Sequence, residues 1–534
     1  MFELLWEASL TLAQTKYLVP LVLGTLVGVV GGALPGVTIT MTVIVVLPFT
    51  FGLDPLQGLA AMTGVYVGGS AGGLVTATLL GIPGTPSSIA TTFDGHPMAR
   101  KGEAGRALWT GVWASFFGGI LGGAFLIAAT GPLAAFALQF GPWEFFSLFV
   151  LALSMVAGLV GASLLKGLLA GVLGMVVTVL GNDPMLGAPR LTLGIRTLEG
   201  GVPFLPVLIG VFAFAQVMGE VERTGGARAA GETAARAMSL AVSHARVLWE
   251  ILSRPFLLVW SSLVGVLIGV LPAVGGSAAN MMAYDQAKKF SPRPQAFGSG
   301  IPEGIIATES SNNANVGGSL VTIMAFGIPG DAVTAVMLGA LTIHGIQSGP
   351  LFISQNAELA YGIFAAYLLA HPIMVLIIAA TARVMLRVVT VPKAVLFPVV
   401  LVLCTVGAFA LNNTMGNVYL LAAFGVAGYA MVKTGLPLAP FILGVILGDQ
   451  IEINLIRAIM TDPNPWLVLT RPIVEPAGEA LAGVVDAVVV EAHQGTGRVR
   501  DLAEMADDPM LVDRLLGVVY VEHGRSKRSR GTGA

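Results

Sequence analysis

Long uncharged apolar runs dominate the chain, separated by short segments that carry its charges. These runs occupy 17–53, 55–93, 107–143, 145–165, 167–182, 200–219, 255–284, 310–330, 332–357, 359–382 and 394–432. A helix needs roughly 20 apolar residues to cross a bilayer, so several runs are long enough for two crossings. Helices satisfy their own backbone hydrogen bonds in lipid, whereas open sheets do not. The pattern therefore predicts an all-α polytopic integral membrane protein with about a dozen membrane segments.

Composition supports the same class. Hydrophobic residues make up 55% of the 534 residues and charged residues only 11%, with a mean hydropathy of +0.84, whereas soluble domains carry about 25% charged residues. The formal net charge of −2 gives no electrostatic basis for binding nucleic acid. A single cysteine, Cys404, excludes an intrachain disulfide framework and a cysteine-built metal site. The expected environment is a lipid bilayer, and no nucleic-acid partner is predicted.

Two polar stretches divide the chain. The stretch at 220–254 is rich in arginine, and the excess of basic residues in cytoplasmic loops predicts that it is a cytoplasmic linker. The stretch at 471–534 ends in a basic sequence and predicts a soluble, partly disordered C-terminal tail. The membrane part then consists of a first repeat at 1–219 and a second repeat at 255–470.

The two membrane regions share an ordered set of short sequences. Gly-Ile-Pro-Gly occurs at 81–84 and again at 327–330. When these two elements are superposed, Leu-Val-Thr also superposes without a gap, and each half carries Leu-Pro after a glycine-rich apolar run further upstream. Two ordered matches on either side of one linker favour duplication over chance. The chain therefore consists of two homologous halves.

The repeated element predicts a break in a membrane helix. Proline removes a backbone donor, and glycine lets the chain leave helical geometry. A break at membrane depth must be buried in protein or line a wet cavity, and paired breaks in two halves indicate a transporter binding site at the midplane. The alternative is a pair of kinks that only allow close helix packing. The expected helix-break residues are Pro35, Gly81, Pro83, Pro272, Gly327 and Pro329.

Small polar residues collect around both breaks. After the first, Thr85, Ser87 and Ser88 stand where a new helix would begin, and free N–H groups at a helix start suit an anion such as a carboxylate. Each hydroxyl has a second interpretation, as a simple cap of that helix. Before the second break lies the polar island 310–313. The candidate substrate-binding residues are Gly84, Thr85, Ser87, Ser88, Ser310, Ser311, Asn312, Asn313 and Gly330.

An acid and several uncharged oxygens also suggest a cation. Glu309 is ionisable within a membrane run, which makes it a functional candidate, although it could instead cap a helix at the interface. Hydroxyl, amide and carbonyl oxygens suit a hard cation such as Na⁺. No phosphate-binding loop for ATP occurs, so energy would come from a gradient. The candidate coupling residues are Ser70, Thr76, Glu309, Asn315 and Thr322, with no cofactor and no other metal expected.

Two other classes are open from the residues alone. An intramembrane hydrolase would need an activated nucleophile, yet the sequence has no Gly-x-Ser-x-Gly or His-Glu-x-x-His pattern. Gly448-Asp449 suggests an aspartyl protease, but no matching second aspartate motif stands out. A membrane channel with a polar filter is the other class. We expect a transporter and no enzyme activity.

Several longer segments resemble one family. They are LPFTFGLDP at 47–55, LGIPGTPSSIA at 80–90, FDGHPMARKG at 93–102, ESSNNA at 309–314 and VTAVMLGAL at 333–341. Over nearly all of 1–472 the chain resembles the large membrane subunit of tripartite tricarboxylate transporters, the TctA family. The resemblance implies a multi-pass subunit of the bacterial inner membrane that takes up carboxylates with a cation gradient. It also implies two partners, a small TctB-like membrane subunit and a periplasmic TctC-like solute-binding protein.

Overall fold

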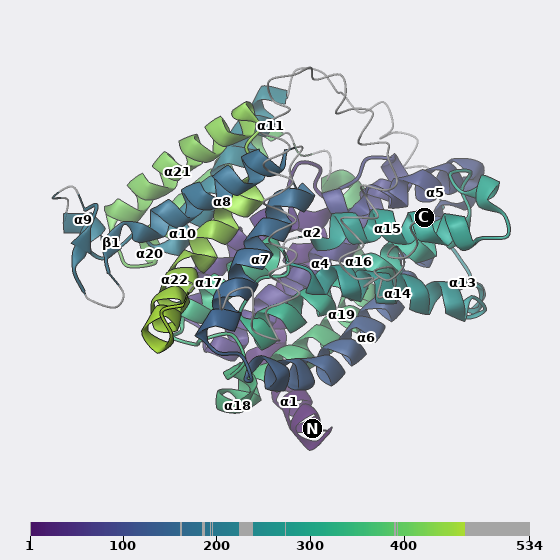
Figure 1. Ribbon diagram of the computed structural model, residues 1–534. Coiled ribbons are helices and arrows are strands. Elements are labelled where there is room, and N and C mark those ends of the chain that lie inside the picture. The colour runs from purple at the N-terminus through teal and green to yellow at the C-terminus, as the bar shows by residue number, and fades with distance from the viewer. Residues whose placement is uncertain are drawn as a thin grey trace, which may run out of the picture.

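The computed structural model describes residues 2–160, 163–183, 187–192, 194, 196–223, 239–272, 274–388, 391 and 393–464. The tail predicted at 471–534 and part of the predicted linker, 224–238, lie outside these residues. Nearly all described elements are helices (Figure 1), and two short strands form an antiparallel pair in which Gly181 faces Arg190. The α-helices are α1 Phe2–Ala13, α2 Thr15–Ala33, α3 Ile39–Val46, α4 Pro55–Leu80, α5 Thr91–Met98, α6 Ala104–Ala137, α7 Pro142–Val160, α8 Leu164–Val179, α9 Arg196–Glu199, α10 Phe204–Leu208, α11 Ala215–Arg223, α13 His244–Leu252, α14 Pro255–Val270, α15 Gly275–Phe290, α16 Pro302–Phe326, α17 Ala332–Ile343, α18 Phe352–Gln355, α19 Ala357–Val388, α20 Lys393–Ala410, α21 Met415–Thr434 and α22 Leu438–Thr461. The other elements are the 3₁₀ turns η1 Leu47–Thr50, η2 Pro86–Ser88 and η5 Pro294–Ala296, the π-helical segments η3 Ala99–Glu103 and η4 Ile209–Phe214, and the strands β1 Gly181–Asn182 and β2 Pro189–Arg190.

The predicted all-α polytopic architecture is confirmed. Within the described residues, seven helices are long and apolar enough to cross a membrane, and the pair α13 and α14, bent by 76°, makes an eighth if counted as one span. Five shorter apolar helices of 10–17 residues accompany them: α3 with η1, α7, α8, α17 and α20. Three of them, α3, α17 and α20, follow from breaks in runs that the sequence shows as continuous. The chain is a multi-pass membrane protein.

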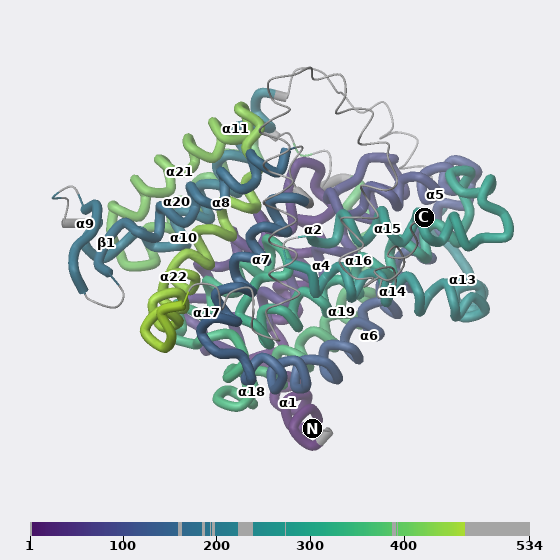
Figure 2. Tube along the Cα trace, in the orientation of Figure 1, coloured from purple at the N-terminus to yellow at the C-terminus, as the bar shows by residue number. Residues whose placement is uncertain are grey.

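Helices α4 and α16 form the centre of the molecule (Figures 1 and 2), and almost every residue in both is buried. In each half, a glycine-rich helix lies directly against the central one. A Cβ on Gly28 of α2 would lie 2.3 Å from the carbonyl oxygen of Val65, and one on Gly265 of α14 would lie 2.2 Å from that of Ser311. Small residues allow this backbone contact, which drives helix association where lipid supplies no hydrophobic effect.

The two halves exchange their last helices. The segment α10, η4 and α11 ends the first half but packs on α20 and α21 of the second half, while α22 of the second half packs on α7 and α8 of the first. Glycines again mark the contacts, since a Cβ on Gly210 would lie 2.5 Å from the oxygen of Leu421 and one on Gly174 would lie 2.0 Å from that of Phe441. Figure 1 shows α10 beside α21 and α22 beside α8. This exchange ties the halves together around the central helices.

Candidate functional site

The helices of both halves end at corresponding sequences. Helix α4 ends at Gly81 with φ 70°, and α16 ends at Gly327 with φ 73°, a left-handed conformation that glycine adopts without a steric penalty. Upstream, α2 ends at Ala33 before Leu34-Pro35, and α14 ends at Val270 before Leu271-Pro272. Each half therefore contributes two interruptions, and all six predicted helix-break residues lie in these four segments.

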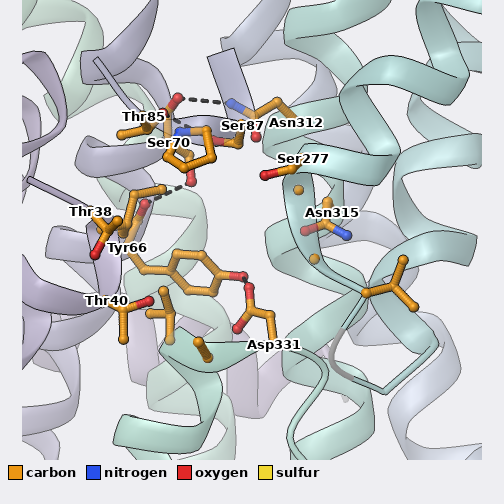
Figure 3. A pocket seen from close by; sticks show the side chains of 17 residues that line it. Thr38, Thr40, Tyr66, Ser70, Thr85, Ser87, Ser277, Asn312, Asn315 and Asp331 are labelled. Atoms are coloured by element: carbon orange, nitrogen blue, oxygen red, sulfur yellow. Dashed lines mark hydrogen bonds between the residues drawn. The ribbon is translucent and has the colours of Figure 1, made fainter. Parts of the chain in front are cut away.

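A cavity of about 190 Å³ lies where the four interruptions meet (Figure 3). Its walls come from matching positions in the two halves. Superposing the Gly-Ile-Pro-Gly elements places Tyr66 on Asn312 and Thr85 on Asp331, and superposing the Leu-Pro pairs places Thr40 on Ser277. All of these residues line the cavity. The cavity thus lies between the two halves, where equivalent segments face one another.

Three of the predicted substrate residues line this cavity. Thr85 and Ser87 come from the first half, and Asn312 comes from the second, where its amide donates to the carbonyl oxygen of Ser70 at 2.9 Å. Figure 3 shows all of them around one space. The two predicted glycines lie behind the lining, because a Cβ on Gly84 would lie 2.1 Å from the oxygen of Gly32. The glycine at 330 lies in the same way against the oxygen of Gly269, at 2.5 Å.

The other predicted substrate residues do not line the cavity. The Ser88 hydroxyl donates to the carbonyl of Thr85, Ser311 donates to that of Ala279, and the Asn313 amide donates to that of Glu309. Ser310 is buried against α6, where a Cβ on Gly118 would lie 2.2 Å from the backbone carbonyl oxygen of Ser310. Ser310 and Ser311 therefore lie at contacts between helices, whereas Ser88 and Asn313 bond to the backbone of their own segment.

The expected new helix after Thr85 is a single 3₁₀ turn, Pro86–Ser88, and α5 begins only at Thr91. The predicted helix start is therefore present at Pro86, but it lasts for one turn. Thr85 and Ser88 form a capping box, and the next turn directs the Ala90 N–H to the Asn280 amide oxygen at 3.0 Å. This hydrogen bond joins the segment to α15 of the second half.

The sequence did not indicate a stronger anion site at the start of α15. The residue at its N-cap, Val274, has no side-chain acceptor, and Gly275, Gly276 and Ser277 line the cavity. Val274 has the right-handed helical backbone conformation, and Gly275 has the left-handed one, with φ 72°. Two such residues in succession form a nest of backbone N–H groups that can bind an anion. The first N–H groups of a helix lack intrahelical partners. The Gly-Gly-Ser sequence after the second Leu-Pro break was the available signal.

Asp331 and its neighbour Tyr66 were also missed. Asp331 is the N-cap of α17, and its carboxylate accepts the N–H of Thr334 at 2.8 Å and the hydroxyl of Tyr66. Figure 3 shows the two side chains pointing toward one another across the cavity. The repeat itself contained the signal, since Asp331 follows Gly330 as Thr85 follows Gly84.

The predicted coupling residues fall into two groups. Ser70 and Asn315 line the cavity, while Thr76 and Thr322 bond to backbone carbonyls beside the breaks. Glu309 lies away from the cavity lining, in the buried interior of α16, so its interpretation as a helix cap was wrong. Its carboxylate accepts the Thr91 hydroxyl at 2.5 Å and the Ser115 hydroxyl at 3.0 Å.

Comparison with known proteins supports one family. A model of the "Tripartite tricarboxylate transporter TctA family" matches residues 18–443. An "Uncharacterized 52.8 kDa protein in TAR-I ttuC' 3'region" of Agrobacterium vitis is 33% identical over 490 residues, which cover 91% of this chain and 95% of that protein. An "Uncharacterized protein in TAR-II ttuC' 3'region" of the same organism is 32% identical over 210 residues, 39% of this chain and 87% of that protein. No solved structure matches. The resemblance expected from the sequence is confirmed, and the chain belongs to the tripartite tricarboxylate transporter TctA family.

Proposed function

We propose that the chain is the large permease subunit of a binding-protein-dependent secondary transporter for carboxylates, driven by a cation gradient. One observation carries the proposal: the cavity between the halves is walled by equivalent segments from four helix interruptions. Binding at such an interface, with the halves moving against each other, is the arrangement by which secondary transporters alternate their access.

The chemistry of the lining favours a small organic anion. Backbone N–H groups at the start of α15, with the positive end of its dipole, suit a carboxylate. Hydroxyls of Ser87 and Ser277 and the amide of Asn312 supply further donors on the wall. The cavity volume of about 190 Å³ is below the roughly 300 Å³ at which sites for drug-sized ligands begin. The substrate would be a tricarboxylate or a related organic acid.

The family membership supports the proposed assembly. Its description as tripartite fits a complex of this chain with a small TctB-like membrane subunit and a periplasmic TctC-like solute-binding protein. Such a complex would lie in the bacterial inner membrane, with the binding protein delivering the acid to the cavity. Choice among acids would then rest largely with the binding protein.

Uptake into proteoliposomes tests the function. Citrate, succinate and benzoate are first screened for binding to the partner solute-binding protein. The acid that binds is then supplied with that protein to vesicles containing both membrane subunits, with and without an inward Na⁺ gradient. A coupled carrier accumulates the acid above its external concentration, whereas a channel only equilibrates it. Equilibration alone, or release of a hydrolysis product, would refute the proposal.

A further inference from the structure

The cavity contains one charged side chain among residues that are otherwise uncharged. The residues that line it, all of them within the described part of the chain, include no lysine, arginine or histidine, and Asp331 is their only carboxylate. Its partners, the N–H of Thr334 and the hydroxyls of Thr334 and Tyr66, all donate to it. Such a set of donors suits the ionised carboxylate.

This negative charge lies beside the proposed anion site. A Cβ on Gly275, at the start of α15, would lie 3.5 Å from the Cβ of Asp331. A substrate carboxylate at that helix start would therefore share the cavity with the Asp331 carboxylate, and no basic side chain lines the cavity to balance them. Like charges repel strongly where water is excluded. A cation bound beside Asp331 would balance this repulsion.

Uncharged oxygens around Asp331 complete a suitable environment for a hard cation. The Tyr66 hydroxyl meets the carboxylate, and the hydroxyl of Ser277 and the amide of Asn315 lie on the same side of the cavity in Figure 3. Oxygen donors of this kind suit Na⁺, and the described residues contain no grouping of three or more histidine, cysteine or acidic side chains for a transition metal.

We propose that Asp331 holds the coupling Na⁺ inside the substrate cavity, so that cation and carboxylate bind as a pair. The inference rests on the proposed function of this cavity. It assigns coupling to a residue outside the set predicted for coupling, and it separates Asp331 from Glu309, whose carboxylate is satisfied by Thr91 and Ser115 outside the lining. The Na⁺ then lies with both carboxylates in the occluded state and offsets part of their repulsion.

The competing explanation is that Asp331 only caps α17. Threonine and asparagine are also good N-caps, and threonine occupies the equivalent position, Thr85, in the first half. Asp331→Thr and Asp331→Asn therefore remove the charge while keeping the cap. Glu309→Gln is the matched control, because it neutralises a buried carboxylate outside the cavity, and Asp331→Glu keeps the charge.

The test measures equilibrium binding of radiolabelled Na⁺ to the purified full chain, with choline as the replacing cation at constant ionic strength. At the concentration that half-saturates the native chain, we expect the Na⁺ bound by Asp331→Thr and Asp331→Asn to fall at least about fivefold, which corresponds to a tenfold weaker affinity, or about 1.4 kcal/mol. Glu309→Gln should stay within about twofold, and Asp331→Glu, which keeps the charge, should bind more Na⁺ than either neutral variant. Retained melting temperatures would show that the variants fold.

A second measurement uses citrate as the probe. Because coupling between two ligands is reciprocal, citrate should tighten Na⁺ binding in the native chain and not in Asp331→Thr. Native Na⁺ binding that survives in both neutral variants would overturn the inference, as would loss in Glu309→Gln alone or no Na⁺ binding by the native chain. Failure of carboxylate uptake with Na⁺ binding intact would instead refute the proposed function.

Discussion

The two halves of the molecule build one cavity with different chemistry. In the first half, Thr38 caps α3 with its own hydroxyl, and Thr85 is neutral. In the second half, α15 begins without a side-chain cap, and the position equivalent to Thr85 holds Asp331. Duplication thus supplied the frame, and divergence placed the free N–H groups and the carboxylate together in the second half. The difference gives the cavity a direction in which a substrate can be oriented.

The halves also differ in how their exchanged helices meet the breaks. Superposing Pro206 and Gly210 on Pro440 and Gly444 places Gln216 on Gln450. The Gln216 amide donates to the oxygen of Gly36 at 3.0 Å, and its own oxygen accepts the Thr38 hydroxyl at 3.1 Å.

Its counterpart behaves differently, since Gln450 is exposed. The glutamine contact with a break is therefore made on one side of the molecule only. Movement of the halves against each other, as proposed for transport, would have to release it.

The largest effect is expected from filling the shared space. Asn312→Leu and Ser87→Leu each place a branched apolar side chain in the cavity and remove a polar group from its wall. Uptake should fall to the level of vesicles without protein, while membrane insertion and melting temperature stay close to native. Unchanged uptake would remove these residues from the substrate site. A Ser88→Ala variant, outside the lining, loses the hydrogen bonds of its hydroxyl with Thr85 and should keep more uptake than either leucine variant.

A second carboxylate would erase the difference between the halves. Thr85→Asp places a charge at the position equivalent to Asp331, in the same cavity. Like charges in one cavity repel more strongly at the low effective dielectric constant of a protein interior than they do in water. The uptake rate should therefore fall about tenfold or more, which corresponds to about 1.4 kcal/mol or more of repulsion. Thr85→Asn, the uncharged variant of nearly equal shape, should retain uptake, and equal loss in both would attribute the effect to packing.

The sequence could predict those features that depend on neighbouring residues, and it could not predict those that depend on residues distant in the chain. The breaks at Gly81 and Gly327 depend on local backbone chemistry, so glycine and proline indicated them directly. The polar island of α16 did not reveal which residues face the cavity, because the whole helix is buried and no apolar stripe orients it. Asn312 and Asn315 lie three residues apart on one face, which only the packed structure distinguishes.

Other features depend on contacts distant in sequence. The exchange of α22 and the α10 to α11 segment joins elements of opposite halves through glycine contacts that leave no local pattern. The role of Asp331 depends on Tyr66, which belongs to the other half. A superposition of the repeat extended past Gly330 would have paired Asp331 with Thr85 and exposed the difference.

The free helix start of α15 should be sensitive to a single methyl group. A Cβ on Gly276 would lie 2.7 Å from the Asn312 amide oxygen and 3.3 Å from the Ser87 Cβ. Overpacking of this kind costs about 1–3 kcal/mol, so the concentration of acid for half-maximal uptake should rise about tenfold in Gly276→Ala. Gly131→Ala is the control, because nothing lies within 4 Å of its Cβ. A native half-maximal concentration in Gly276→Ala would mean that the acid does not approach this helix.

The smallest effect concerns the unequal glutamine contacts. Gln216→Ala removes two hydrogen bonds that hold α11 on the α2–α3 break, whereas Gln450→Ala removes an exposed side chain. Each hydrogen bond is worth about 0.5–1.5 kcal/mol, so the loss of two in Gln216→Ala should open this side about fivefold more often. The labelling rate of a cysteine introduced at Thr40, in a chain with Cys404 replaced, measures the opening. Equal acceleration by both alanine variants would show that the effect does not come from the Gln216 contact, and no acceleration by Gln216→Ala would show that this contact does not restrain this side.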